Sequence, residues 1–251
     1  MEQFFTKDYT GAPFVLFDSG HLISMALIAA ICFSMLYFRN VLDERGRRNF
    51  RYGLAVFLAI AELSWQAWSV YYGTWTIQTN LPFHLCSVFV WLSIIMLVNK
   101  SYTIYELAYF LGVGGAMQAV ITPDAGIYGL PHFRAVQTLA GHGGIVLAAL
   151  YMTWVEGYRP TWKSFKTVVI WTNVYMVIVF FINLAIGSNY MFIAHKPDFP
   201  SLLDLLAPWP WYILELEVLA LVICFILYLP FMVKDWAAGN CFNVAWHNKN
   251  S

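Results

Sequence analysis

The sequence predicts an all-α, polytopic membrane protein: a bundle of seven transmembrane helices with the N-terminus outside and the C-terminus cytoplasmic. Of the 251 residues, 60% are hydrophobic and only 11% are charged, and the mean hydropathy is +0.62. Soluble domains carry about 25% charged residues, so this chain has more apolar surface than one soluble core can bury. Only helices and closed barrels satisfy their backbone in lipid, and alternating strands of about ten residues are missing. The apolar runs are therefore predicted to be helices.

Seven apolar runs approach the length of about 20 residues that a helix needs to cross a membrane. In chain order they cover residues 20–38, 52–73, 81–98, 103–122, 135–156, 167–187 and 210–233. No internal repeat or linker separates them. Residues 1–251 are therefore predicted to form a single integral membrane domain.

The basic residues predict the orientation of this bundle, because cytoplasmic loops carry an excess of Lys and Arg. Eleven of the fourteen fall on one side: Arg39, Arg45, Arg47, Arg48, Arg51, Lys100, Arg159, Lys163, Lys166, Lys234 and Lys249. The other three, Lys7, Arg134 and Lys196, fall on the opposite side. The side with eleven is predicted to be cytoplasmic. With a net charge of zero, nothing in the chain suggests binding to nucleic acid.

Polar residues inside the predicted helices gather at one depth. Most lie in outer halves, helix by helix: Gln66, with Glu62 near the middle of the same helix, then His84 and Cys86, Gln118, His142, Asn183, and finally Glu215 and Glu217. Burying such groups in lipid costs several kcal/mol each unless they meet partners or water. We therefore expect a shared polar cavity that opens to the outside.

Two of these side chains, Cys86 and His142, are predicted to meet. At 1.5 Å per residue, Cys86 lies about 7 Å below the start of its helix and His142 about 10 Å below the start of its own. His84 is about 200° round the helix from Cys86, which makes it a poorer partner. Cys86 is also the only cysteine in an outer half, so a free thiol is expected. The glycines of GVGGA (112–116) and GHGG (141–144) favour close packing of the two helices that carry them.

Other interpretations of these residues stay open. A cysteine in a membrane helix is usually a small packing residue, and an intramembrane histidine is often structural. The glutamates also fit simple hydrogen bonding between helices. The histidines and cysteines lack metal-ligand spacing, so no metal or other cofactor is expected.

Three segments carry a resemblance to a known family: LPFHLCS (81–87), the AGHGG of the fifth helix, and SNYMFIAHKPDFPSLLDLLAPWPWYILELE (188–217). They resemble bacterial YwaF-type integral membrane proteins, which are similar to the prokaryotic branch of the TMEM164 family. The resemblance runs from the first predicted helix to the seventh. It implies a multi-pass protein of the bacterial cell membrane.

The resemblance also implies an activity. Eukaryotic members look like cysteine-dependent acyltransferases that remodel phospholipids without acyl-CoA, with membrane lipids as substrates. By this likeness Cys86 is the acyl-accepting nucleophile and His142 its base. Such chemistry leads us to expect that Glu215 or Glu217 orients His142, and that Gln66, Gln118 or Asn183 donates to the oxyanion.

The segment 188–210 is expected to lie at the membrane surface over the cavity, either as a lid or as an anchor. Its most specific polar residues are Asn189, Tyr190 and Asp204. Two other functions remain: an outward-facing carrier of a small molecule, and a ligand-binding or sensor protein without catalysis. A carrier needs polar residues in the inner halves, which are few here, and a sensor has no need of a thiol.

Overall fold

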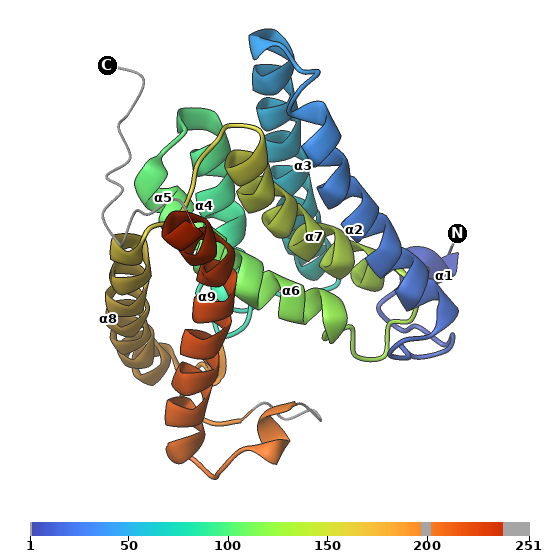
Figure 1. Ribbon diagram of the computed structural model, residues 1–251. Coiled ribbons are helices and arrows are strands. Elements are labelled where there is room, and N and C mark those ends of the chain that lie inside the picture. Colours follow the sequence, from blue (N-terminus) through green and yellow to red (C-terminus); the bar gives the residue numbers. More distant parts are fainter. Residues whose placement is uncertain (1, 197–201, 238–251) are drawn as a thin grey trace.

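The computed structural model describes residues 2–196 and 202–237, and every regular element in this part of the chain is a helix (Figure 1). The α-helices are α1 (Glu2–Phe5), α2 (Ser19–Phe38), α3 (Glu44–Tyr71), α4 (Leu85–Asn99), α5 (Tyr102–Leu107), α6 (Val113–Ile121), α7 (Phe133–Trp154), α8 (Trp162–Ile186) and α9 (Trp211–Ala237). A π-helical turn, Ala108–Gly112, joins α5 to α6, and two short 3₁₀ helices, Tyr190–Phe192 and Leu202–Leu205, follow α8.

Six helices are long and apolar enough to cross a membrane: α2, α3, the continuous run Tyr102–Ile121, α7, α8 and α9. Each matches a predicted range, and the all-helical membrane fold is confirmed. The one predicted range that does not match any of these six helices is 81–98, the third in chain order. It is helical only from Leu85, and the resulting helix α4 has 15 residues. Pro82 and the extended backbone of His84 hold the preceding residues in a loop, which shortens the helix.

Helix α3 begins eight residues before the predicted range, because its first two turns are charged rather than apolar. Asp43 caps this extension, since its carboxylate accepts a hydrogen bond from the Gly46 N–H. Helix α8 likewise starts at a capping box between Thr161 and Ser164. Hydropathy alone does not detect such polar helix starts.

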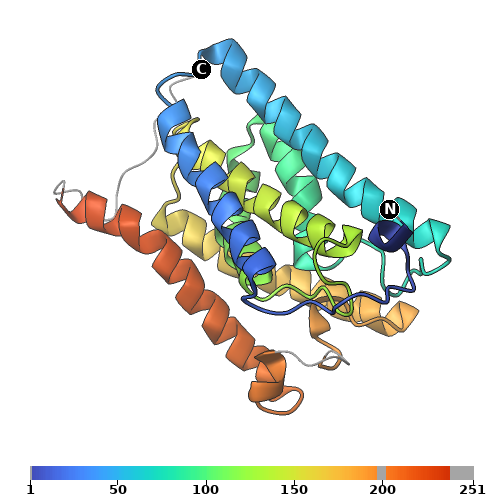
Figure 2. The ribbon, with the colours of Figure 1, turned by 90° about the vertical axis from the view of Figure 1, so that its right-hand side faces the viewer.

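Helix α7 forms the centre of the bundle, with α2, α3, α4 and α6 packed around it (Figures 1 and 2). Glycines permit this packing. A Cβ atom on Gly144 would lie 2.7 Å from Leu58 of α3, and one on Gly143 would lie 3.1 Å from Ile28 of α2. Gly112, in the π-helical turn, similarly faces Ile145 of α7 at 3.2 Å. The predicted contact between the fourth and fifth helices is therefore present.

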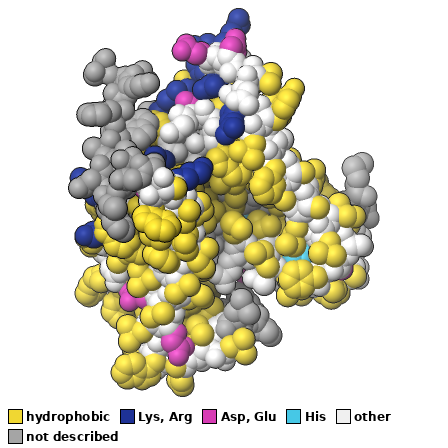
Figure 3. Space-filling view, viewed as in Figure 1, with side chains coloured by type: hydrophobic (Ala, Val, Ile, Leu, Met, Phe, Trp, Pro, Cys, Tyr) yellow, Lys and Arg dark blue, Asp and Glu magenta, His cyan; other side chains and the backbone are white. Residues whose placement is uncertain are grey.

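Helices α8 and α9 lie at the edge of the bundle. Only 11% of the apolar window of each is buried inside the protein, against 72% for α7. The surface that includes them is largely hydrophobic, whereas Lys and Arg gather at one end of the molecule (Figure 3). A broad apolar face with a basic end is the surface that a multi-pass membrane protein presents to lipid and to the membrane–water boundary.

Candidate functional site: a cysteine at a helix N-terminus beside a histidine

Cys86 lies in the first turn of α4 and its thiol is free and half-buried. His84 occupies the N-cap position but its side chain makes no capping hydrogen bond. The N–H groups of Leu85, Cys86 and Ser87 have no acceptor among the residues that the structure describes. Uncapped N–H groups and the positive end of the helix dipole favour an anion at this position.

His142, near the middle of α7, lies close enough to the Cys86 thiol for an electrostatic and hydrogen-bonding interaction. Its Nδ1 lies 2.7 Å from the carbonyl oxygen of Thr138, one turn earlier in α7. A carbonyl only accepts, so Nδ1 carries the proton of the neutral ring and Nε2 is left with a free lone pair. That tautomer gives the thiol an acceptor. Neither side chain is completely enclosed by the protein.

The expected role of Glu215 or Glu217 is corrected by this arrangement, because the Thr138 carbonyl already holds His142. The Glu215 carboxylate is exposed and accepts a hydrogen bond from the Ala207 N–H, 2.8 Å away, in the segment before α9. Helix α9, which carries both glutamates, packs mainly on α8, α6 and the π-helical turn. Among the described residues, Glu217 makes no hydrogen bond with either member of the pair.

Gln66 does not have a free donor for an oxyanion. Its Nε2 donates both to Glu62, at 2.9 Å, and to the carbonyl of Asn80, at 3.0 Å. Its Oε1 accepts from the indole of Trp75 at 2.8 Å. Gln66 therefore ties the loop after α3 to α3 itself, and it shields the buried Glu62 carboxylate.

Asn183 and Tyr190 form a second polar group, which fixes the loop in front of α4. Asn183 donates to the carbonyl of Tyr190 and accepts from its N–H and from the Ser188 hydroxyl. The fully buried Tyr190 hydroxyl then donates to the carbonyl of Ile77 at 2.8 Å and accepts from the N–H of Leu81 at 2.9 Å. The motif of residues 188–192 thus holds the segment 77–81 in place.

His84 belongs to the same contact region rather than to the Cys86 pair. Its Nδ1 accepts a 3.3 Å hydrogen bond from the N–H of Met191, and its ring packs on Tyr190 and Phe192. Met191 and Phe192 adopt positive φ angles of 60° and 53°, which are strained for residues other than glycine. The strained turn covers the residue that precedes α4.

The other predicted supporting residues lie elsewhere. Asn189 bonds to the backbone and ring of His195 and closes its own loop, and Gln118 is exposed on α6. The outer-half polar residues therefore divide into separate hydrogen-bonded groups instead of lining one cavity. Residues 197–201, which include Pro197 and Pro200, lie outside the described part of the chain, as do Cys241 and Lys249.

Arg134, which the sequence marks only as a basic residue on the outer side, lies beside this site. Its guanidinium stacks on Trp65 at 3.4 Å and interacts electrostatically with Glu62, Asp124 and His142. Arg134, Thr138 and His142 follow one another at intervals of four positions, which places them on one face of α7. This spacing is the sequence signal from which the contact could have been predicted. No group of three His, Cys, Asp or Glu side chains suited to a metal occurs among the described residues.

Comparison with known families gives one finding. The model of the TMEM164 family matches residues 16–228, from before α2 into α9. Curated proteins and solved structures give no match. Because the match covers most of the chain and includes both Cys86 and His142, this multi-pass helical membrane protein belongs to the TMEM164 family.

Proposed function

We propose that this protein is an acyltransferase of the membrane, which moves a fatty acyl chain from a phospholipid to a lysolipid through an acyl-cysteine at Cys86. The observation that supports this most is the pairing of Cys86 with a His142 ring whose Nδ1 is held by the Thr138 carbonyl. Nucleophilic catalysis needs such a pair, with the base oriented by a third group.

The first half of the reaction transfers the acyl chain to Cys86 and uses His142 as the base. The Cys86 sulfur attacks the ester carbonyl carbon of the donor lipid, and its proton passes to Nε2 of His142. The tetrahedral oxyanion is stabilised by the uncapped N–H groups at the start of α4, which take the place that the sequence assigned to Gln66, Gln118 or Asn183. Collapse of this intermediate expels the lysolipid oxygen, which takes the proton back from His142.

The second half of the reaction repeats these steps with the acceptor. His142 removes the proton from a lysolipid hydroxyl, whose oxygen attacks the thioester carbonyl and releases the Cys86 thiol. The thioester retains the acyl energy, so neither acyl-CoA nor ATP takes part. The reaction is a transacylation.

We also propose that α4 crosses the membrane as a seventh, short helix, with the N-terminus outside and the C-terminus cytoplasmic. The eleven-to-three distribution of basic residues supports this orientation. The likeness to YwaF-type proteins supports the bacterial cell membrane as the location. Cys86 then faces the outer leaflet, and its lipids are the substrates.

The test is a search for the acyl-enzyme. Purified protein in nanodiscs is incubated with an acyl-labelled phospholipid without acceptor, and Cys86 is examined by mass spectrometry for a hydroxylamine-sensitive adduct. We expect the adduct on the wild type and on Cys32→Ser, which alters a buried thiol outside the site, but not on Cys86→Ser. His142→Ala is expected to slow transfer by about 10²–10⁴-fold.

The double variant Cys86→Ser/His142→Ala is expected to be no slower than Cys86→Ser alone, since residues that act as one unit do not add their losses. The carrier and sensor interpretations predict no adduct on any variant. Acyl transfer by Cys86→Ser at the wild-type rate would exclude the covalent mechanism.

A further inference from the structure

A second site lies at the basic end of the molecule, far from Cys86. A pocket of about 830 Å³ is lined by the start of α3 and by the residues that follow α4 and α7. Its lining residues are Asp43, Glu44, Arg45, Arg47, Arg48, Arg51, Lys100 and Glu156. Lys100 is 14 residues beyond Cys86, which places the pocket about 20 Å away along α4. Its volume is in the range of ligand sites.

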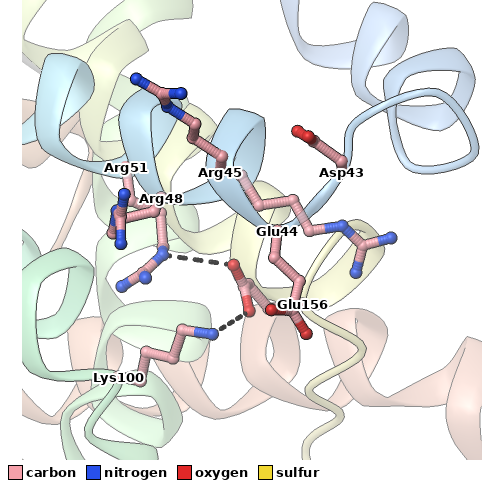
Figure 4. A pocket seen from close by; sticks show the side chains of 8 residues that line it. Asp43, Glu44, Arg45, Arg48, Arg51, Lys100 and Glu156 are labelled. Carbon is pink, nitrogen blue, oxygen red and sulfur yellow. Dashed lines mark hydrogen bonds and ion pairs between the residues drawn. The ribbon is translucent and has the colours of Figure 1, made fainter.

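Part of this charge maintains the fold. Glu156 forms ion pairs with the buried Arg51, at 3.2 Å, and with Lys100, at 2.7 Å, and its carboxylate lies between them (Figure 4). Arg51 also donates to the carbonyl of Leu97 at 2.6 Å. Arg47 donates to three carbonyls, those of Arg39, Leu42 and Val155. These contacts tie together the ends of α2, α4 and α7 and fix the pocket walls.

Two arginines that line the pocket take no part in these structural contacts. Arg45 and Arg48 are exposed, and neither forms an ion pair or a hydrogen bond with any residue that the structure describes. The Asp43 carboxylate is engaged with the Gly46 N–H at the start of α3. Five basic residues face three acidic ones, so the pocket carries an excess of positive charge on a preformed frame.

We propose that this pocket binds a phosphate group through Arg45 and Arg48, with Lys100 and the rigid Arg47 and Arg51 supplying the positive field around it. Guanidinium groups form paired hydrogen bonds that match phosphate oxygens. The pocket lies where spanning helices end, so the phosphate comes either from an anionic phospholipid headgroup or from a soluble phosphate compound.

The positive-inside rule alone does not account for this arrangement. Orientation in the membrane requires basic residues near helix ends but not a concave surface, and Lys163 and Lys166 at the start of α8 meet that need outside the pocket. Here the unpaired arginines stand beside a cavity whose walls are held by the buried Arg51–Glu156 ion pair and by the Lys100–Glu156 ion pair. Holding the helix ends together requires Arg47 and Arg51 but does not explain why Arg45 and Arg48 are present.

The test measures binding to the purified full-length protein in detergent by isothermal titration. The probes are dioctanoyl phosphatidic acid, dioctanoyl phosphatidylcholine and inorganic pyrophosphate. We expect Arg45→Gln/Arg48→Gln to weaken phosphatidic acid binding by about 30-fold, since each basic residue beside an anionic headgroup contributes roughly fivefold. The control, Lys163→Gln/Lys166→Gln, removes the same charge from exposed positions at the neighbouring helix start and should leave binding unchanged.

The three probes distinguish a phospholipid headgroup from a soluble phosphate compound as the ligand. Arginine-dependent binding of both phosphatidic acid and pyrophosphate supports a phosphate site open to soluble compounds, and binding of phosphatidic acid alone supports a lipid headgroup site. The proposal is overturned if neither anion binds more tightly than phosphatidylcholine. It is also overturned if the control pair weakens binding as much as the arginine pair, because the effect is then one of overall charge.

Discussion

Tyr190→Phe removes one oxygen atom and tests whether the 188–192 motif positions the start of α4. The Tyr190 hydroxyl joins the carbonyl of Ile77 to the N–H of Leu81 by hydrogen bonds of 2.8 and 2.9 Å. Phenylalanine keeps the ring, which is fully buried and packs edge-on against Phe83. The variant therefore leaves apolar packing unchanged and strips two backbone groups of their partner.

The size of the effect follows from those two groups. A fully buried polar group without a partner costs about 1–3 kcal/mol. Ile77 is exposed and Leu81 is half-buried, so we take about 1–2 kcal/mol for each group and expect the loop 77–81 to lose about 2–4 kcal/mol of local stability. Each 1.4 kcal/mol is a factor of ten, so protected amides of this loop should exchange hydrogen roughly 30- to 1,000-fold faster. The Leu81 N–H should show the largest change.

Hydrogen–deuterium exchange with peptide-level mass spectrometry measures the exchange rate of peptides that contain the loop 77–81, with the protein in nanodiscs. The matched control is Tyr71→Phe, which removes a hydroxyl from a side chain that is 82% exposed and should change exchange little. Acyl transfer should also fall in Tyr190→Phe if the loop sets the position of Cys86. Unchanged exchange across 77–81 would refute the role given to the Tyr190 hydroxyl.

Two further predictions concern α7. Gly144→Ala places a Cβ 2.7 Å from Leu58 and should destabilise the protein by about 2 kcal/mol, which lowers the Tm by roughly 4–8 °C. The control, Gly141→Ala, has its nearest neighbour at 4.0 Å and should not lower the Tm. Equal Tm values for the two variants would refute the packing argument. Burial lowers the pKa of His132 below 6.5, although its hydrogen bond to the Thr6 carbonyl partly offsets this. The unfolded chain therefore takes up the proton first, and stability present above pH 6.5 should decline as the pH falls from 6.5 through the lowered pKa of the folded state. His132→Asn retains a side-chain acceptor for the α7 cap without titrating, so its Tm should depend less on pH, and an unaltered slope would assign the effect to other groups.

The sequence was sufficient for most of the fold because hydropathy determines which segments enter the membrane. All seven predicted ranges contain helix, and errors occur where polar chemistry sets the boundary. The charged start of α3 depends on its Asp43 cap, and the late start of α4 depends on the loop before Leu85. Neither feature changes the average hydropathy of a window.

The site was less predictable because it depends on how the helices face each other. The depth of Cys86 and His142 could be counted along the chain, and the structure does bring the two together. The group that orients His142 could not be found this way, because a backbone carbonyl such as that of Thr138 has no signature in sequence. Glu215 and Glu217 have the right depth but lie on a helix that packs elsewhere.

Under the proposed function, in which α4 crosses the membrane and Cys86 accepts the acyl chain, the shortness of α4 links acyl transfer to the thickness of the bilayer. Fifteen residues extend about 22 Å, against a hydrocarbon core of about 30 Å. With the C-terminal end of α4 at one edge of the core, the thiol lies several ångströms inside the other edge, beneath the level where lipid ester groups reside. The ester must sink or the surrounding bilayer must thin, and each ångström of this hydrophobic mismatch costs a fraction of a kcal/mol. A thinner host membrane therefore brings the ester to the start of α4 at lower cost, which makes the chain length of bystander lipids a determinant of the transfer rate.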